Sequence, residues 1–174
     1  FDENITHMMS IDEILVSLSD TIQAMINVNR IYVLIRGVDG QYRIEHTTNP
    51  LDEKNFYIRS DHPLIPYLKQ KGGCTLFKDF SRNTIYRSMW EKEKKLLMDL
   101  NLECFVPLMA EDELVGIVML AGKENKAEYH PNDFAFVQSL STTCANAVKN
   151  AYAYEKALEE AQKDEMTSLI NRKF

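Results

Sequence analysis

The chain has 174 residues, of which 45% are hydrophobic and 26% are charged, and its formal net charge is −6. This length and composition are typical of one globular domain with a substantial core. The negative charge argues against non-specific nucleic-acid binding and against contact with an anionic membrane, because both favour a basic patch. No apolar run approaches the roughly 20 residues that span a membrane.

The three cysteines, Cys74, Cys104 and Cys144, are widely spaced and odd in number. They form no Cys-x-x-Cys pair, which argues against a zinc knuckle or a redox dithiol. Free cysteines without a signal-peptide pattern are typical of a reducing compartment, so we expect a cytoplasmic protein. Because the sequence begins with Phe1, we interpret it as an excised fragment.

The first elements can be assigned from capping and turn signals. Ser10 and Glu13 form a capping-box pattern, and apolar residues recur at helical spacing as far as Ile26, so a helix is expected there. Residues 30–36 are β-branched and aromatic, and a glycine-containing turn joins them to a partner strand at 41–48.

The later elements alternate between helices and strands. We expect, in chain order, a short strand at 56–59, a helix from Asp61 to Gly72-Gly73, a strand from Cys74 to Phe80, a helix from Ser88 to Leu100, a hairpin of 102–110 with 114–122, and a long helix from Pro131. Hairpin-linked strands flanked by helices predict an α+β fold with a mainly antiparallel sheet.

The long helix contains no Gly or Pro after Asp133 and carries a heptad-like seam. The seam consists of Leu140, Cys144, Ala147, Ala151, Tyr154, Leu158 and Ala161. One interpretation is a core helix whose C-terminal half frays. The other is a parallel coiled-coil connector that joins two copies of the chain and carries a signal.

Several segments together resemble a GAF domain. Pro107-Leu108, the strand 114–120, the helix start at 129–133 and the Ala-Asn-Ala-containing stretch 145–152 resemble the second half of that family, and 10–15 with 29–39 resemble its first half. The resemblance implies a sensory domain over residues 1–154. It also implies terminal helices packed on one face of the sheet and a pocket on the other.

The C-terminal residues resemble the opening of a GGDEF domain, the diguanylate cyclase module of cyclic di-GMP signalling. The matching positions are Asp164, Thr167, Leu169, Asn171, Arg172 and Phe174. The resemblance implies that 164–174 are the truncated start of such a module and that 155–163 form a helical or coiled-coil linker. The signature that performs catalysis would lie beyond Phe174, so we expect no enzyme activity from this fragment, whereas its parent would be a transferase.

No metal-ligand spacing, phosphate loop or catalytic constellation occurs in the sequence. A pocket between the sheet and segment 56–100 would use apolar walls and a few polar groups, and its ligand is unknown. The candidate ligand-binding residues are Tyr57, Phe77, Asp79, Arg82, Trp90 and Cys104. Each has an ordinary alternative: Trp90 as a core anchor, Asp79 as a turn cap, Arg82 as a solvated cation, and Cys104, like Cys74, as a small buried hydrophobe.

We therefore expect a homodimeric, small-molecule-sensing domain that controls a C-terminal diguanylate cyclase module in cis through its helical linker. Two other functions stay open. The chain could be a dimerisation domain without a ligand, its pocket filled by its own side chains. It could also be an enzyme resembling the methionine-sulfoxide reductases of this fold, which use cysteines.

Overall fold

The computed structural model describes residues 9–49 and 56–173, with side chains as far as Ile170. Its elements are α2 Ile11–Ile26, β1 Ile31–Arg36, β2 Tyr42–Thr47, β3 Tyr57–Ile58, α3 Leu64–Lys71, β4 Thr75–Leu76, α4 Phe77–Ser81, α5 Thr84–Arg87, α6 Glu91–Asp99, β5 Leu102–Ala110, β6 Glu113–Ala121 and α7 Pro131–Lys173. This order of helices and strands confirms the predicted α+β class.

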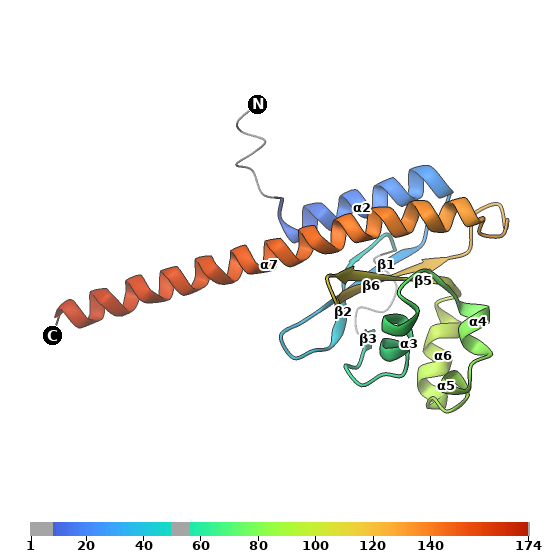
Figure 1. Ribbon diagram of the computed structural model, residues 1–174, viewed down its shortest axis with the longest axis horizontal. Helices are drawn as coiled ribbons and strands as arrows, with labels where there is room; N and C mark the ends of the chain where they lie inside the picture. The colour runs from blue at the N-terminus through green and yellow to red at the C-terminus, as the bar shows by residue number, and fades with distance from the viewer. Residues whose placement is uncertain (1–8, 50–55, 174) are drawn as a thin grey trace.

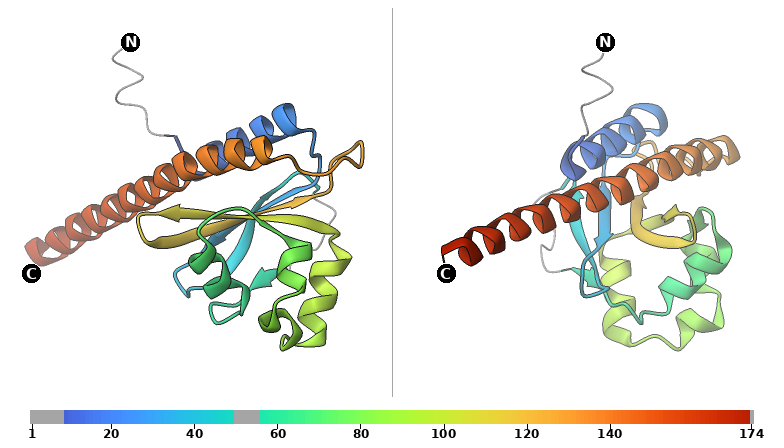
Figure 2. Two further views of the ribbon diagram at one scale, coloured as in Figure 1. Left: turned by 45° about the vertical axis from the view of Figure 1, so that its right-hand side comes forward. Right: turned by 60° about the vertical axis from the view of Figure 1, so that its left-hand side comes forward.

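The strands form one curled sheet in the order β3-β2-β1-β6-β5-β4, and every neighbouring pair is antiparallel. Helices α2 and α7 lie side by side across one face of this sheet, whereas α3 to α6 cover the other face (Figures 1 and 2). The terminal helices thus share one face, as the family resemblance implied.

Helix α2 begins where the capping box predicts. The Ser10 hydroxyl accepts a hydrogen bond from the Glu13 backbone N–H at 3.2 Å, and the Glu13 carboxylate accepts the Ser10 N–H at 3.4 Å. The helix ends at Asn27, which adopts the left-handed conformation at φ 58°, a common way to close a helix. Its buried stripe, including Leu15, Leu18 and Ile22, packs towards the sheet and α7.

The sheet separates two hydrophobic cores. In β1, Val33 and Ile35 pack under α2 and α7 in what we call the first core. Tyr32 and Leu34 pack against α3 to α6 in the second core. This alternation follows from the two-residue period of a strand. Because both faces are covered, the central strands are apolar throughout, and their sequences alone do not indicate which residue faces which core.

The segment between β3 and β5 differs from its prediction. The strand expected from Cys74 to Phe80 lasts only two residues, because the chain turns into α4 at Phe77. Phe80 then points into the second core, where its ring lies 5.0 Å from Tyr67 and 5.5 Å from Tyr86. The short helix α5 was not predicted, and α6 begins at Glu91, with Trp90 as its capping residue.

Helix α7 is 43 residues long and has two environments. Cys144, Ala145, Val148 and Ala151 are buried in the first core, but every described side chain from Tyr152 onwards is exposed. The first half of the predicted seam therefore packs within the domain, and a coiled coil stays a prediction only for the part beyond Ala151.

Both ends of the chain extend beyond the described residues. The side chains of Asn171 and Arg172, the residue Phe174 and the segment 1–8 are outside the described residues. Among the described helices, none combines the length and the apolar character that a membrane-spanning helix needs.

Candidate functional site

The space between the sheet and α3 to α6 is largely filled by the chain's own side chains. Phe80 and Phe105 are both fully buried and meet edge to face at 6.1 Å, and Tyr32, Leu34 and Met119 complete this side of the sheet without exposure. Two cavities open at the rims of this layer: the Trp90 cleft beside β3 and α6, and the edge pocket beside β4.

The Trp90 cleft has a volume of about 280 Å³ and an aromatic lining. Phe56, almost fully buried, forms its floor, while Tyr57 and Trp90 retain exposures of 46% and 64%. Large aromatic side chains that gather at a cavity with this much exposure are typical of binding surfaces. The cleft is lined by Phe56, Tyr57, Arg59, Trp90, Lys92, Glu93 and Leu96.

Arg59 fixes the polar side of this cleft. Its Nε and Nη2 atoms donate to the two Glu93 carboxylate oxygens at 3.1 and 3.0 Å, and its guanidinium lies 4.4 Å from the centre of the Trp90 ring. Asp61 accepts a further hydrogen bond from Nη1 at 2.5 Å. Because a bidentate pair restricts the guanidinium plane, Arg59 holds the Trp90 ring in a defined orientation.

His62 lies beneath this ion pair and is only 2% exposed. Its Nδ1 accepts a hydrogen bond from the Leu64 backbone N–H at 3.0 Å, and its Nε2 lies 3.5 Å from a Glu93 oxygen. The accepting Nδ1 places the proton of the neutral ring on Nε2, towards Glu93. Burial lowers the pKa of His62 below its ordinary value, against the opposing charge of Glu93.

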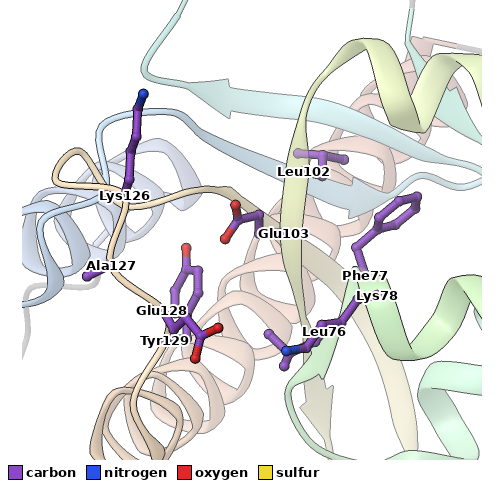
Figure 3. A pocket seen from close by; sticks show the side chains of 9 residues that line it. All are labelled: Leu76, Phe77, Lys78, Leu102, Glu103, Lys126, Ala127, Glu128 and Tyr129. Carbon is purple, nitrogen blue, oxygen red and sulfur yellow. The ribbon is translucent and has the colours of Figure 1, made fainter.

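The edge pocket has a volume of about 310 Å³ and a mixed lining. Figure 3 shows the carboxylates of Glu103 and Glu128 and the Tyr129 ring on one side, and Phe77 and Leu102 on the other. The Tyr129 hydroxyl donates to the Ala121 carbonyl at 2.5 Å, and burial raises the pKa of this phenol. Leu76, Lys78, Lys126 and Ala127 complete the lining.

The structure brings together only part of the predicted site. Tyr57 and Trp90 share the Trp90 cleft, and Phe77 lines the edge pocket instead. Asp79 and Arg82 are exposed and line neither cavity. The interpretation of Trp90 as an ordinary core anchor is wrong, because its ring stands at the surface before the first turn of α6.

Cys104 lies on the opposite face of the sheet from the predicted pocket. It is 1% exposed and belongs to the core beneath α2 and α7, together with Val106 and Leu108. The alternation of side chains along β5 places it there. The prediction that Cys104 lines the ligand pocket is therefore wrong.

Sequence reasoning missed Arg59 and Glu93, although they order the cleft. They are 34 residues apart, and each looks like an ordinary surface charge in the sequence. Only the fold brings them together. Among residues 9–49 and 56–170, no group of three or more His, Cys, Asp or Glu side chains is arranged to hold a metal ion.

Residues 10–148 match the sequence profile of the GAF domain family. The chain belongs to this family, and the observed layers of helices around a curled antiparallel sheet are those of its members. The role typical of this family is sensory.

One relative extends the comparison beyond the domain. Diguanylate cyclase A of Treponema denticola is 29% identical over 119 residues, which is 67% of this chain and 30% of that protein. The match thus spans less than a third of the relative's length.

Solved structures agree on the fold. A GAF domain/HD domain protein from Geobacter sulfurreducens superimposes with a TM-score of 0.66 at 18% identity, covering 83% of this chain and 95% of the other. The GAF domain of a two-component sensor histidine kinase from Bacillus halodurans gives a TM-score of 0.62 at 19% identity, with coverages of 84% and 99%. At these identities the likeness establishes the architecture alone.

Proposed function

We propose that this chain is the input domain of a diguanylate cyclase, and that it changes the output of a C-terminal cyclase module through α7. One observation carries the proposal: α7 runs without interruption from the buried residues Val148 and Ala151 to the segment that resembles the start of a GGDEF module. The diguanylate cyclase among its relatives supports the same output. In this division residues 1–154 sense, 155–163 connect and 164–174 begin the effector.

The Trp90 cleft is the site at which we place the ligand. Its exposed aromatic rings and its apolar floor favour a small molecule with a planar or apolar part. Most hydrogen-bonding capacity of Arg59 is already used by Glu93 and Asp61, so the ligand would stack rather than form a strong ion pair there. Lys92 is the other basic residue in the lining.

A cytoplasmic homodimer is the assembly that this output requires, because two cyclase modules must meet to join two GTP molecules. Apolar side chains on the exposed part of α7 supply a surface for pairing: Tyr154, Leu158, Met166, Leu169 and Ile170. The three cysteines carry no disulfide, which is usual in a reducing compartment.

Helix insertion in the full-length protein tests the coupling. Two residues added after Glu159 would turn everything beyond them by about 200°, whereas seven added residues would return the helix to within about 20° of its original face. We expect the seven-residue insertion to preserve regulated synthesis of cyclic di-GMP from GTP, and the two-residue insertion to abolish regulation. Equal behaviour of both variants, or a full-length protein without cyclase activity, would refute the proposal.

Trp90 supplies a direct readout of the ligand, because it is the only tryptophan in the chain. Native mass spectrometry of the protein purified from cells should reveal a retained small molecule. Adding that molecule to ligand-free protein should change the tryptophan emission. Trp90→Phe should weaken the retention measured by mass spectrometry, and Met98→Ala, which changes an exposed α6 residue outside the cleft lining, should not. If both variants retained the small molecule equally, its binding site would lie outside the Trp90 cleft.

The filled space around Phe80 and Phe105 also fits a domain that dimerises without a ligand. Such a domain would be purified without a bound molecule, and its oligomeric state alone would set cyclase activity. A reductase function has less support, since Cys104 is buried beneath the terminal helices and lines neither cavity. Turnover of free methionine sulfoxide that disappears in Cys104→Ser would be needed to restore it.

A further inference from the structure

Two cysteines that are far apart in the sequence become neighbours in the sheet. Leu76 of β4 pairs with Cys104 of β5, and Thr75 pairs with Phe105. Cys74 is two residues before Leu76 and so lies diagonally across from Cys104, on the same face. Both side chains join the core beneath α7, and each thiol is close enough to perturb the pKa of the other.

The two thiols have different surroundings. Cys104 is 1% exposed, whereas Cys74 is partly exposed at the end of the sheet. Interaction with Cys104 lowers the pKa of the Cys74 thiol, whereas interaction with Cys74 together with burial raises the pKa of Cys104. Cys74 is therefore the thiol that forms the thiolate more readily and that a dissolved oxidant can reach.

The backbone around Cys74 is able to adjust. Cys74 precedes the first ladder pair of β4, and it follows Gly72, at φ 71°, and Gly73. A disulfide needs its Cα atoms about 4.4–6.8 Å apart, whereas diagonal residues of a ladder are about 7–8 Å apart. The remaining approach of about an ångström therefore falls on Cys74, which lies outside the ladder and directly after two glycines.

We propose that Cys74 and Cys104 form a reversible intramolecular disulfide in response to hydrogen peroxide. The Cys74 thiolate attacks one peroxide oxygen, the O–O bond breaks, and a sulfenic acid and water result. The Cys104 sulfur then attacks the Cys74 sulfur, the S–O bond breaks, and a second water leaves with the thiol proton. Two thiols are oxidised by two electrons, and one peroxide is reduced to two waters. A dithiol reductant reverses the reaction by exchange.

The disulfide would change a contact with α7. The Cys74 sulfur lies 3.7 Å from the Phe134 carbonyl oxygen and 3.6 Å from Gln138 Oε1, both in the first turns of that helix. An oxidised sulfur has no proton to donate, so these interactions end when the disulfide forms. The chemistry itself does not depend on the Trp90 cleft or on a cyclase module, and it can be tested without either.

Peptide mapping gives a direct test, because trypsin places each cysteine on its own peptide: 72–78, 96–123 and 127–149. The reduced protein is treated with hydrogen peroxide, remaining thiols are alkylated with iodoacetamide, and the digest is kept non-reducing. We expect one new species, 72–78 joined to 96–123, in a protein of unchanged oligomeric state. The joined peptide should disappear after treatment with dithiothreitol.

Cysteine variants provide the controls. Cys144→Ser should form the joined peptide like the original protein, because Cys144 lies on α7 and outside the pair. Cys74→Ser should form none, and Cys104→Ala should leave Cys74 to proceed to sulfinic acid. The result that would overturn the proposal is a treated protein in which all three cysteines remain alkylated, or one in which 72–78 pairs with itself or with 127–149. Mapping of the unaltered chain decides this even if a variant fails to fold.

Discussion

Gly116 is the position where one added carbon should cost the protein most. It lies in β6, where it pairs with Ile35 of β1 on one side and with Leu108 of β5 on the other. A Cβ atom at this position would lie 2.5 Å from the Leu34 carbonyl oxygen and 2.9 Å from the Cδ1 atoms of Ile35 and Leu108. The two methyl groups could turn away, but the carbonyl belongs to the backbone at the centre of the sheet.

This geometry sets the size of the effect. Overpacking of a core typically costs 1–3 kcal/mol, and relief here requires the central ladder to move, so we expect Gly116→Ala to lower the free energy of unfolding by about 3 kcal/mol. For a domain of this size that corresponds to a fall in Tm of about 6–12 °C. Urea unfolding followed by circular dichroism measures the change, and an unaltered m-value would show that the denatured state is the same.

Gly73→Ala is the matched control. Its added carbon would have Gln138 Oε1 at 3.6 Å as its nearest neighbour, an ordinary contact. We expect a change within about 0.5 kcal/mol, or a slight gain from the less flexible unfolded chain. If Gly116→Ala were as stable as Gly73→Ala, β1 and β5 could not approach Gly116 of β6 as closely as described.

Three other substitutions test local features. Burial lowers the pKa of His62, so on acidification the unfolded chain protonates this histidine before the folded protein does. The stability contributed by neutral His62 is complete above the ordinary histidine pKa and falls as the pH decreases from about 7 to about 5. His62→Asn should reduce this pH dependence in urea titrations at several pH values, and an unchanged dependence would assign the effect to other groups. Ser10→Ala should cost about 1 kcal/mol by removing the cap of α2, and full stability in thermal unfolding would contradict the capping box. Within the described residues the buried Ser19 hydroxyl has no hydrogen-bond partner, so Ser19→Ala should leave stability unchanged or raise it by up to about 1 kcal/mol; a loss would reveal a partner.

Local signals predicted those elements whose cause is local. The Ser10 capping box, the hairpin of β5 and β6, and the start of α7 at Pro131 all depend on residues a few positions apart. The segment from Cys74 to Phe80 has the β-branched and aromatic character of a strand, yet it becomes a helix after Leu76. There the burial of Phe80 among distant aromatic rings outweighs local propensity.

The candidate site was less accessible to sequence reasoning. Tyr57 and Trp90 were named because they are aromatic, but the Arg59–Glu93 pair that orders their cleft joins residues from separate elements. The side of the sheet that Cys104 faces could not be read either, because β5 is apolar on both faces. The spacing of the cysteines argued against a redox pair, whereas the register of β4 with β5 places Cys74 beside Cys104.

The exposed part of α7 also has a mechanical consequence. From Tyr152 to Ile170 every side chain is exposed and the helix is continuous, a length of about 28 Å at 1.5 Å per residue. A tilt of only about 5° where the helix leaves the core would move its far end sideways by about 2.5 Å. Helix α7 would therefore act as a lever arm for any such tilt, turning a small rotation in the domain into a displacement of roughly the width of an atom at its far end.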